Sequence, residues 1–220
     1  MGKNLTSEEA FAILEDVYGP IEWEPRRDPT SELVYTILSQ HTSDINSIRA
    51  FENLVGRFGV WEEVEKAEVK DIEIAIWEGG LARVKSQRIK DILIAIRHKR
   101  GDLDLSFLGE MELRDSKNWL ISLPGVGPKT AAVVLCFALG MPAMPVDTHI
   151  HRVSKRIGLI DQKTTAEQAH DILETSISPE NIFPFHVYLI NHGREVCKAL
   201  RPRCLGCVMK NKCPSASMGL

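Results

Sequence analysis

The sequence lacks a long hydrophobic run. Its longest apolar stretch, residues 131–139, is much shorter than the roughly 20 residues that a membrane-spanning helix requires. It also shows no secretory segment with an apolar core near its start. Together these absences predict an intracellular protein with no membrane partner, in the cytoplasm or nucleoid if the source is a prokaryote.

Strand patterns, internal repeats and low-complexity segments are lacking as well. Apolar residues recur instead at helical spacing, as at Ile89, Ile92, Leu93 and Ile96, so we predict an all-α fold of about ten helices. With 220 residues, of which 44% are hydrophobic, the chain can bury a core as one or two domains. The helices are expected to break near residues 18–29, 79–80, 100–105, 140–145 and 177–184.

An excess of basic residues is also missing. The chain has 27 Lys and Arg against 30 Asp and Glu, a net charge of −3, whereas proteins that bind nucleic acids are often basic. The charges are unevenly distributed, however. Acidic residues crowd segment 62–73 and basic residues crowd segment 83–100. The total charge therefore does not favour a nucleic-acid partner, but its distribution allows one.

Residues 123–131, Leu-Pro-Gly-Val-Gly-Pro-Lys-Thr-Ala, predict a glycine hairpin that opens an apolar helix. Gly125 and Gly127 allow left-handed or crowded backbone, so that their amides can approach a phosphate. Pro128 suits the first helical position, and the positive end of the helix favours an anion in front of it. Lys129 lies on this first turn as a candidate nucleophile. The alternative is a plain connection between helices with a solvated lysine.

Asp147 follows a segment that contains two prolines and that cannot be helical. It is placed to cap the next helix. In a functional interpretation, the chain reversal at 140–145 brings its carboxylate and the amine of Lys129 to one cleft. An amine that attacks C1′ of a deoxyribose, beside a carboxylate that stabilises positive charge on the sugar, would cut an N-glycosidic bond. A metal site at Asp147, His149 and His151 is the rival, which helix geometry disfavours because residues two apart point to different sides.

Cysteine is scarce outside one segment. Four of the five cysteines, Cys197, Cys204, Cys207 and Cys213, are separated by six, two and five residues. Disulfides are disfavoured, and the spacing indicates a metal site. Zinc sites usually show two Cys-x-x-Cys pairs, so this looser loop favours a four-thiolate iron-sulfur cluster, with zinc as the alternative. The surrounding lysines and arginines favour a phosphate-facing surface or balance an anionic cluster.

In combination, these features resemble the endonuclease III family of helix-hairpin-helix DNA glycosylases over nearly the whole chain. The carrying segments are residues 37–44, 123–131, 146–152, 192–194 and the cysteine loop. The resemblance implies that Lys129 forms a Schiff base with the abasic sugar and that Asp147 assists glycosidic cleavage. It implies that the four cysteines bind a structural [4Fe-4S] cluster. It also implies that Gln40 fills the gap left when the damaged base is flipped out of the duplex.

The family also implies a domain arrangement and a partner. Residues 28–140 would form a six-helix barrel with the helix-hairpin-helix, and residues 1–27 and 141–220 a helical domain with the cluster loop 197–213. Double-stranded DNA with a damaged base or an abasic site would bind a monomer in the cleft between them. Contacts to DNA are expected from Gln40, Gly125, Val126, Gly127, Thr130, His149 and Arg152.

The resulting function is a base-excision-repair glycosylase with β-elimination lyase activity on damaged pyrimidines. A mismatch-specific uracil or thymine glycosylase and a non-catalytic DNA-binding module are the alternatives. Lys129 together with Asp147 favours an enzyme, because a module that only grips DNA has no use for a carboxylate against the phosphates. Thr36 stands where adenine-mismatch glycosylases of the superfamily have a catalytic glutamate. His41 and Ser43 differ from the best-known members of the family, which leaves the preferred base open.

Overall fold

The computed structural model describes residues 5–217, which contain helices and no strand. The all-α prediction is confirmed for these residues. They form more helices than the sequence predicted, because short ones such as α4 (Trp61–Lys66) contain too few turns to produce a visible periodicity.

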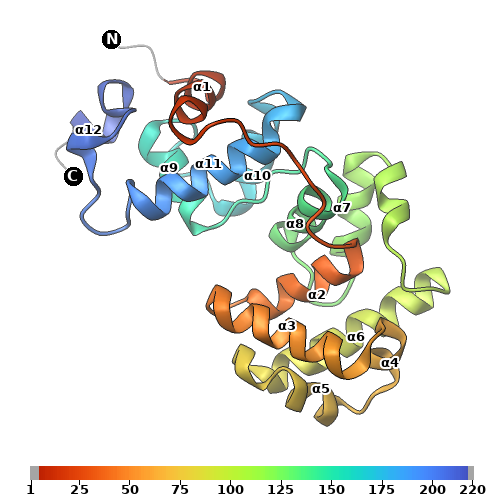
Figure 1. Cartoon of the computed structure of the whole chain (residues 1–220). Coiled ribbons are helices and arrows are strands. Elements are labelled where there is room, and N and C mark those ends of the chain that lie inside the picture. Colours follow the sequence, from red (N-terminus) through yellow and green to blue (C-terminus); the bar gives the residue numbers. More distant parts are fainter. Residues whose placement is uncertain (1–4, 218–220) are drawn as a thin grey trace. The chain divides into compact units, whose positions relative to one another are not determined.

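The chain divides into two compact units, each of which is described by itself (Figure 1). The hairpin unit runs from Pro25 to Leu139. The cysteine unit combines the residues up to Glu24 with those from Gly140 onward. The six-helix barrel expected over residues 28–140 stays a prediction.

The hairpin unit is built around one almost completely buried helix, α2 (Pro29–Ser39). Asp28 caps it by accepting a hydrogen bond from the backbone N–H of Ser31 at 2.9 Å, and Pro29 takes the first helical position. The apolar side chains of α2, such as Leu33 and Ile37, are fully buried, and buried polar ones such as Thr30 and Thr36 donate hydrogen bonds to backbone carbonyls. The other helices are α3 (Asp44–Phe58), α4, α5 (Val69–Ala75), η1 (Trp77–Gly79), α6 (Ala82–Arg100), η2 (Ser106–Glu110), α7 (Leu113–Ile121) and α8 (Pro128–Leu139).

A buried carboxylate anchors the start of this unit. Glu32 is fully buried in α2 and forms ion pairs with Arg26 and Arg27. The Arg27 guanidinium lies 3.9 Å from the centre of the Tyr35 ring, a favourable cation–π position. These contacts attach residues 25–28 to α2, because a buried carboxylate without its cations would be strongly unfavourable.

The cysteine unit has α11 (Ile182–Glu195) at its centre. Phe185 and Tyr188 of α11 contact the ring of Phe11 in α1 (Ser7–Tyr18), with ring centroids 6.1 and 5.6 Å apart. The Tyr188 hydroxyl donates to the carbonyl of Gly19 at 2.7 Å. The remaining helices are α9 (Thr148–Ile157), α10 (Ala166–Thr175), η3 (Pro179–Asn181), η4 (Cys204–Gly206), η5 (Lys210–Lys212) and α12 (Pro214–Ser217).

One predicted break is shorter than expected. The interruption near residues 177–184 ends where α11 begins at Ile182, so Pro184 lies inside the first turn of the helix. Proline is tolerated there because the first backbone N–H groups of a helix have no partner within it.

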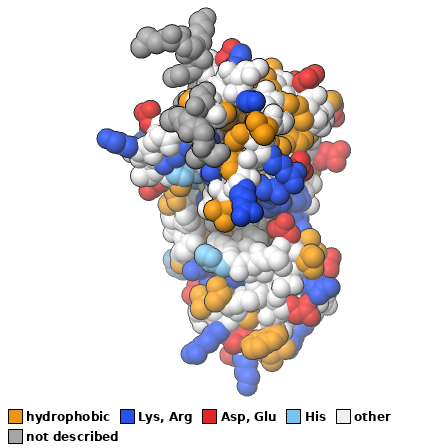
Figure 2. Space-filling model, turned by 90° about the vertical axis from the view of Figure 1, so that its left-hand side faces the viewer, with side chains coloured by type: hydrophobic (Ala, Val, Ile, Leu, Met, Phe, Trp, Pro, Cys, Tyr) orange, Lys and Arg blue, Asp and Glu red, His pale blue; other side chains and the backbone are white. Residues whose placement is uncertain are grey.

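Within residues 5–217, no helix combines the length and the apolar character that crossing a membrane requires. Hydrophobic side chains are nevertheless present at the surface, interspersed with charged ones on the face drawn in Figure 2.

At Gly79, η1 lies close to α3. A Cβ atom at this position would lie 2.9 Å from the Cβ of Ala50, so backbone would have to move. Gly56 is the matched control, because a Cβ there meets no atom within 4 Å. We expect Gly79→Ala to lower the free energy of unfolding by about 1–3 kcal/mol. Gly56→Ala should raise it by about 0.5–1 kcal/mol. Urea unfolding followed by circular dichroism measures both, and equal changes would contradict the close packing.

Candidate active site

The glycine hairpin joins α7 to α8 within the hairpin unit. Gly125 has φ +72°, and its turn is closed by a 3.2 Å hydrogen bond from the Val126 N–H to the Leu123 carbonyl. At Gly127 the expected left-handed or crowded backbone is not found, because its φ is not positive and a Cβ there meets no atom within 4 Å; the approach of its amide to a phosphate stays a prediction. The protein itself therefore does not require glycine at 127. Among the described residues, the amides of Gly125 and Gly127 have no acceptor.

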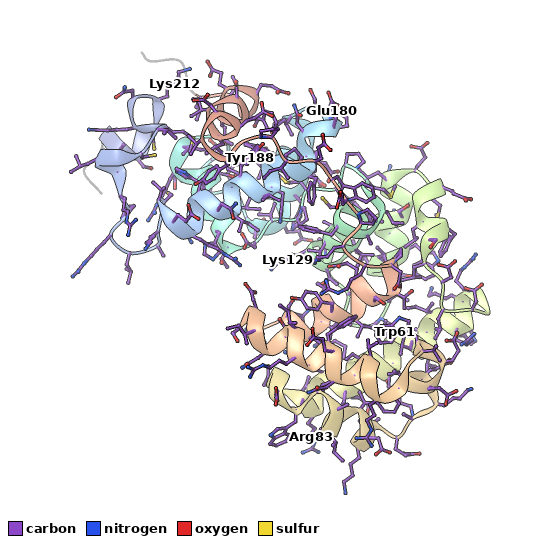
Figure 3. All side chains as sticks on the ribbon, viewed as in Figure 1. Trp61, Arg83, Lys129, Glu180, Tyr188 and Lys212 are labelled. Carbon is purple, nitrogen blue, oxygen red and sulfur yellow. The ribbon has the colours of Figure 1, made fainter. Side chains whose placement is uncertain are left out.

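Lys129 lies on the first turn of α8, as predicted, and is labelled in Figure 3. Its side chain is exposed and forms no hydrogen bond or ion pair within residues 5–217. Val126 and Thr130 on either side of it are 5% and 6% exposed. These two residues therefore pack the hairpin against the unit, and contacts of theirs with DNA stay a prediction.

The turn that carries Gln40 is held by a buried lysine. Lys85 in α6 is 2% exposed, and its Nζ donates to the Leu38 carbonyl and the Thr42 hydroxyl at 2.6 Å and to the Gly79 carbonyl at 2.9 Å. Burial lowers the pKa of Lys85 to about 8, and the charge of Arg88 acts in the same direction. One side chain thus joins the turn after α2 to the turn before α6.

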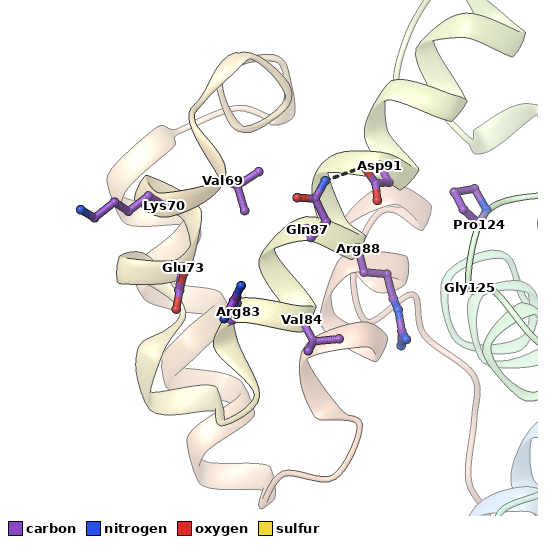
Figure 4. Close-up of a pocket in the computed structure, with 10 residues that line it drawn as sticks. All are labelled: Val69, Lys70, Glu73, Arg83, Val84, Gln87, Arg88, Asp91, Pro124 and Gly125. Atoms are coloured by element: carbon purple, nitrogen blue, oxygen red, sulfur yellow. Dashed lines mark hydrogen bonds between the residues drawn. The ribbon is translucent and has the colours of Figure 1, made fainter.

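Sequence reasoning did not single out Arg88. This residue lies one turn after Lys85 in α6, and its Nη1 donates to Oε1 of Gln40 at 2.7 Å. Together with Arg83, Pro124 and Gly125 it lines a groove beside α6 (Figure 4). Only the basic character of segment 83–100 pointed to it, because α2, α6 and the hairpin are far apart in the sequence.

The acidic and basic segments partly neutralise each other. Arg97 of α6 pairs with Glu62 at 3.2 Å and with Glu65 at 3.0 Å, both in α4. Arg57 of α3 pairs with Asp71 of α5 at 2.7 Å. Arg97 thus joins the basic segment 83–100 to the acidic segment 62–73 through ion pairs.

Asp147 begins α9 in the cysteine unit, where its Oδ1 accepts from the backbone N–H of Ile150 at 2.7 Å. The predicted N-cap is confirmed. The segment before it is held by side chains of α10 and α11: His170 contacts the Met144 carbonyl at 2.7 Å, and His186 contacts the Pro145 carbonyl at 2.9 Å. The residue that carries the carboxylate is thus held by the start of α9 after it and by a fixed segment before it. Because Lys129 lies in the other unit, its meeting with Asp147 stays a prediction.

Arg152 and His149 contact each other rather than standing free. Arg152 Nη2 lies 3.2 Å from Nδ1 of His149 and donates to the Gly193 carbonyl at 2.8 Å, while Nε donates to the Cys197 carbonyl at 3.1 Å. The other imidazole of the segment, His151, lies 2.9 Å from the carbonyl of Thr164 instead. Arg152 therefore joins α9 to α11 and to the cysteine loop, and its expected contact with DNA stays a prediction.

Gly193, in the His-Gly-Arg segment 192–194, allows this junction. A Cβ at Gly193 would lie 3.0 Å from the Cβ of His149 and 3.2 Å from Val153. Only a residue without a side chain lets α9 and α11 approach so closely without displacement.

The four predicted ligands line one cavity of the cysteine unit, together with Arg156 and His192; they are Cys197, Cys204, Cys207 and Cys213. Arg156 donates to the Lys198 carbonyl at 2.6 Å, and its Nη1 lies 3.6 Å from Sγ of Cys197. His192 Nε2 lies 3.6 Å from Sγ of Cys207. Within residues 5–217, no three His, Cys, Asp or Glu side chains are grouped so as to hold a single metal ion.

The thiols influence one another's charge. Burial raises the pKa of the Cys207 thiol, and the three other cysteines of the loop raise it further. Burial lowers the pKa of His192 to about 4, so its imidazole is neutral at physiological pH. Four soft donors that face one cavity are a donor set that fits an iron-sulfur cluster.

Comparison with known proteins identifies the relatives of the chain. Residues 34–179 match the model of the HhH-GPD superfamily base excision DNA repair protein. The chain is 35% identical to endonuclease III of Thermotoga maritima over 187 residues, covering 84% of this chain and 83% of that protein. It is 32% identical to endonuclease III of Sulfolobus acidocaldarius over 189 residues, covering 85% and 82%.

The fold has a close counterpart among solved structures. A trapped endonuclease III–DNA covalent intermediate matches with a TM-score of 0.78 at 27% identity, covering 97% of this chain and 98% of that one. The similarity therefore includes both the hairpin unit and the cysteine unit.

Proposed function

This chain belongs to the HhH-GPD superfamily of base excision DNA repair proteins, and on this premise we propose that it is a bifunctional DNA glycosylase and abasic-site lyase. Its partner is duplex DNA that contains a damaged base or an abasic site. The observation that carries the proposal is Lys129, an exposed amine without a partner among the described residues, directly behind a glycine hairpin. Its relatives named endonuclease III support the enzyme over a non-catalytic module or a mismatch-specific glycosylase. An activity on genomic DNA also supports the expected intracellular location.

The chemistry would begin when the lone pair of Nζ of Lys129 attacks C1′ of the damaged nucleotide, so that an Nζ–C1′ bond forms and the nitrogen gives up a proton. The glycosidic bond breaks, and its electron pair leaves with the base, which takes up a proton. The sugar ring then opens as the C1′–O4′ bond breaks: its electron pair goes to O4′, which takes up a proton, and the nitrogen lone pair forms a protonated imine between Nζ and C1′. Loss of a proton from C2′ then expels the 3′-phosphate by β-elimination, and water releases the lysine. Covalent attachment divides one difficult displacement into easier steps.

Asp147 would stabilise positive charge that develops on the sugar. One carboxylate oxygen is engaged by the Ile150 amide, and the other has no partner among the described residues. A charge fixed before the reaction lowers the barrier without reorganisation. The free amides of Gly125 and Gly127, at the positive end of α8, would hold a phosphate of the same strand.

Endonuclease III enzymes are generally known to carry a [4Fe-4S] cluster. In this chain Cys197, Cys204, Cys207 and Cys213 would hold it, with a structural role. The cavity that all four line supports this proposal. When bound, the cluster would supply four iron–sulfur bonds that cross-link the loop.

Borohydride trapping tests the nucleophile. On duplexes with one thymine glycol or one abasic site, the native protein should form a covalent adduct that an undamaged duplex does not form. Lys129→Gln should abolish the adduct and strand cleavage, while binding of the abasic duplex stays within about tenfold, because only one cation is lost. Lys99→Gln, at an exposed site on α6, is the control and should trap normally.

Strand cleavage by Lys129→Gln would contradict the assignment. An adduct of the native protein with the abasic duplex alone would keep the lyase and move the base from oxidised pyrimidines to uracil, mismatched thymine or alkylated bases.

Replacing Asp147 by Asn separates catalysis from capping. Asparagine caps a helix about as well as aspartate, so the melting temperature should stay nearly constant. The rate of base release in single turnovers should fall by at least about tenfold, more than binding does, because the lost charge acts on the transition state. Asp147→Ser also preserves a cap and should behave in the same way. Normal base release by both variants would leave Asp147 with its capping role only.

The cluster gives the protein a colour that can be measured. We expect broad absorbance near about 400 nm, as thiolate-bound iron clusters show. Cys207→Ser should reduce the absorbance and the iron content, whereas Cys136→Ala should keep both, because Cys136 is buried in α8 outside the cavity. A colourless protein with one equivalent of zinc would overturn the assignment.

A further inference from the structure

The side chain of Gln40 does not stand free in the hairpin unit. Its Oε1 accepts a hydrogen bond from Nη1 of Arg88 at 2.7 Å. A guanidinium group only donates hydrogen bonds, so the partner atom of the carboxamide must be its oxygen. The usual ambiguity between the two ends of a glutamine amide is thereby removed. The NH₂ group of Gln40 is left as the end that is not held by Arg88.

Arg88 is itself held in place. Its Nε and Cδ lie 3.0 and 3.2 Å from the point where a Cβ of Gly125 would stand, so the side chain lies against the hairpin. Figure 4 shows Arg88 extending from α6 on the side of Pro124 and Gly125, whereas Arg83 of the same helix lies elsewhere along the groove. Within residues 5–217 no carboxylate pairs with Arg88.

The backbone around Gln40 is held separately. Lys85 binds the Leu38 carbonyl and the Thr42 hydroxyl, on either side of Gln40. Two residues one turn apart on α6 therefore have separate roles, since Lys85 holds the main chain of the turn and Arg88 holds the end of the side chain. Loss of Arg88 should leave the turn in place and free only the carboxamide.

We propose that Arg88 is a positioning residue that fixes the orientation of the Gln40 carboxamide and thereby determines how the enzyme discriminates among bases opposite the lesion. This inference rests on the proposed function, in which Gln40 enters the gap left by the flipped nucleotide. An amide held by its oxygen presents N–H donors to the opposite base. An amide free to rotate presents either end, and so adapts to donors and acceptors alike.

The test depends on the difference between a contact whose strength depends on the base and a contact with the phosphate backbone. A side chain that only contacts phosphate strengthens binding equally for every sequence, whereas one that controls a base contact changes the ratio between sequences. A fixed amide that gains or loses one hydrogen bond should separate the best and worst opposite bases by about fivefold in Kd.

The experiment measures binding by fluorescence anisotropy to four duplexes. Each contains one tetrahydrofuran abasic-site analogue, opposite adenine, cytosine, guanine or thymine in turn. This probe needs no base removal, so its outcome does not depend on which damaged base the enzyme releases. The native protein, Arg88→Met, Arg88→Lys and Arg83→Met are compared. Arg83→Met is the matched control, since it removes a positive charge from an exposed site on the same helix and groove.

We expect a spread in Kd of about fivefold for the native protein. Arg88→Met should reduce the spread to within about twofold, and Arg88→Lys, which still donates, should keep most of it. Arg83→Met should weaken all four complexes alike and keep the spread. On a Gln40→Ala background, Arg88→Met should cause no further change in the spread, because both substitutions remove the same interaction.

Three results would overturn the inference: a native protein without a spread, a spread that survives Arg88→Met, or equal weakening of all four duplexes by that variant. Thermal unfolding of each variant confirms that it is folded, with Arg88→Lys as the milder substitution. Borohydride trapping on the abasic duplex is run in parallel. If the native protein forms no covalent adduct, the proposed lyase is refuted. If it forms the adduct but binds all four duplexes with the same Kd, only the role of Arg88 is refuted.

Discussion

The ammonium group of Lys85 is the constraint on which the arrangement of the hairpin unit depends. A buried cation is strongly unfavourable unless hydrogen bonds replace its water. Here three acceptors do so: the Leu38 carbonyl, the Thr42 hydroxyl and the Gly79 carbonyl. Because these acceptors belong to two different turns, the cation can be satisfied only when both turns are in place. The turn that carries Gln40 is therefore held by contacts within the protein, without any contact with DNA.

From this fixed turn the remaining parts of the site follow by contact. Arg88, one turn further along α6, reaches Gln40 and lies against Gly125 of the hairpin. The hairpin in turn sets the start of α8, where Lys129 is exposed. These contacts lead from the buried Lys85 to the exposed Lys129, which is the proposed nucleophile. A reactive amine can remain accessible because residues behind it, rather than contacts of its own, define its position.

In the cysteine unit, one helix, α9, positions both the Asp147 carboxylate and the cysteine loop. Asp147 caps the helix at its start, Arg152 and Arg156 bind carbonyls of residues 193–199, and Cys213 donates to the Arg156 carbonyl at 3.3 Å. The close contact of α9 with α11 at Gly193 is what brings these groups within reach. A metal cluster in the loop would thus reinforce a connection that the arginines already make.

The sequence by itself determined the elements with local causes. The helical periodicity, the cap at Asp147, the proline at the start of α8 and the spacing of the cysteines depend on residues close in the chain, and the structure reproduces the first three directly. Sequence reasoning was wrong about the left-handed or crowded backbone expected at Gly127. It was also wrong about the end of the break before α11, because Pro184 falls within the first turn of that helix.

Only the tertiary structure decided which charges are internal. Lys85, Arg88 and Arg97 look alike in the basic segment of the sequence, yet one is a buried anchor, one holds Gln40, and one pairs with Glu62 and Glu65. The physical reason is that the role of a charged side chain is set by the acceptors it meets, and these come from helices that are distant along the chain.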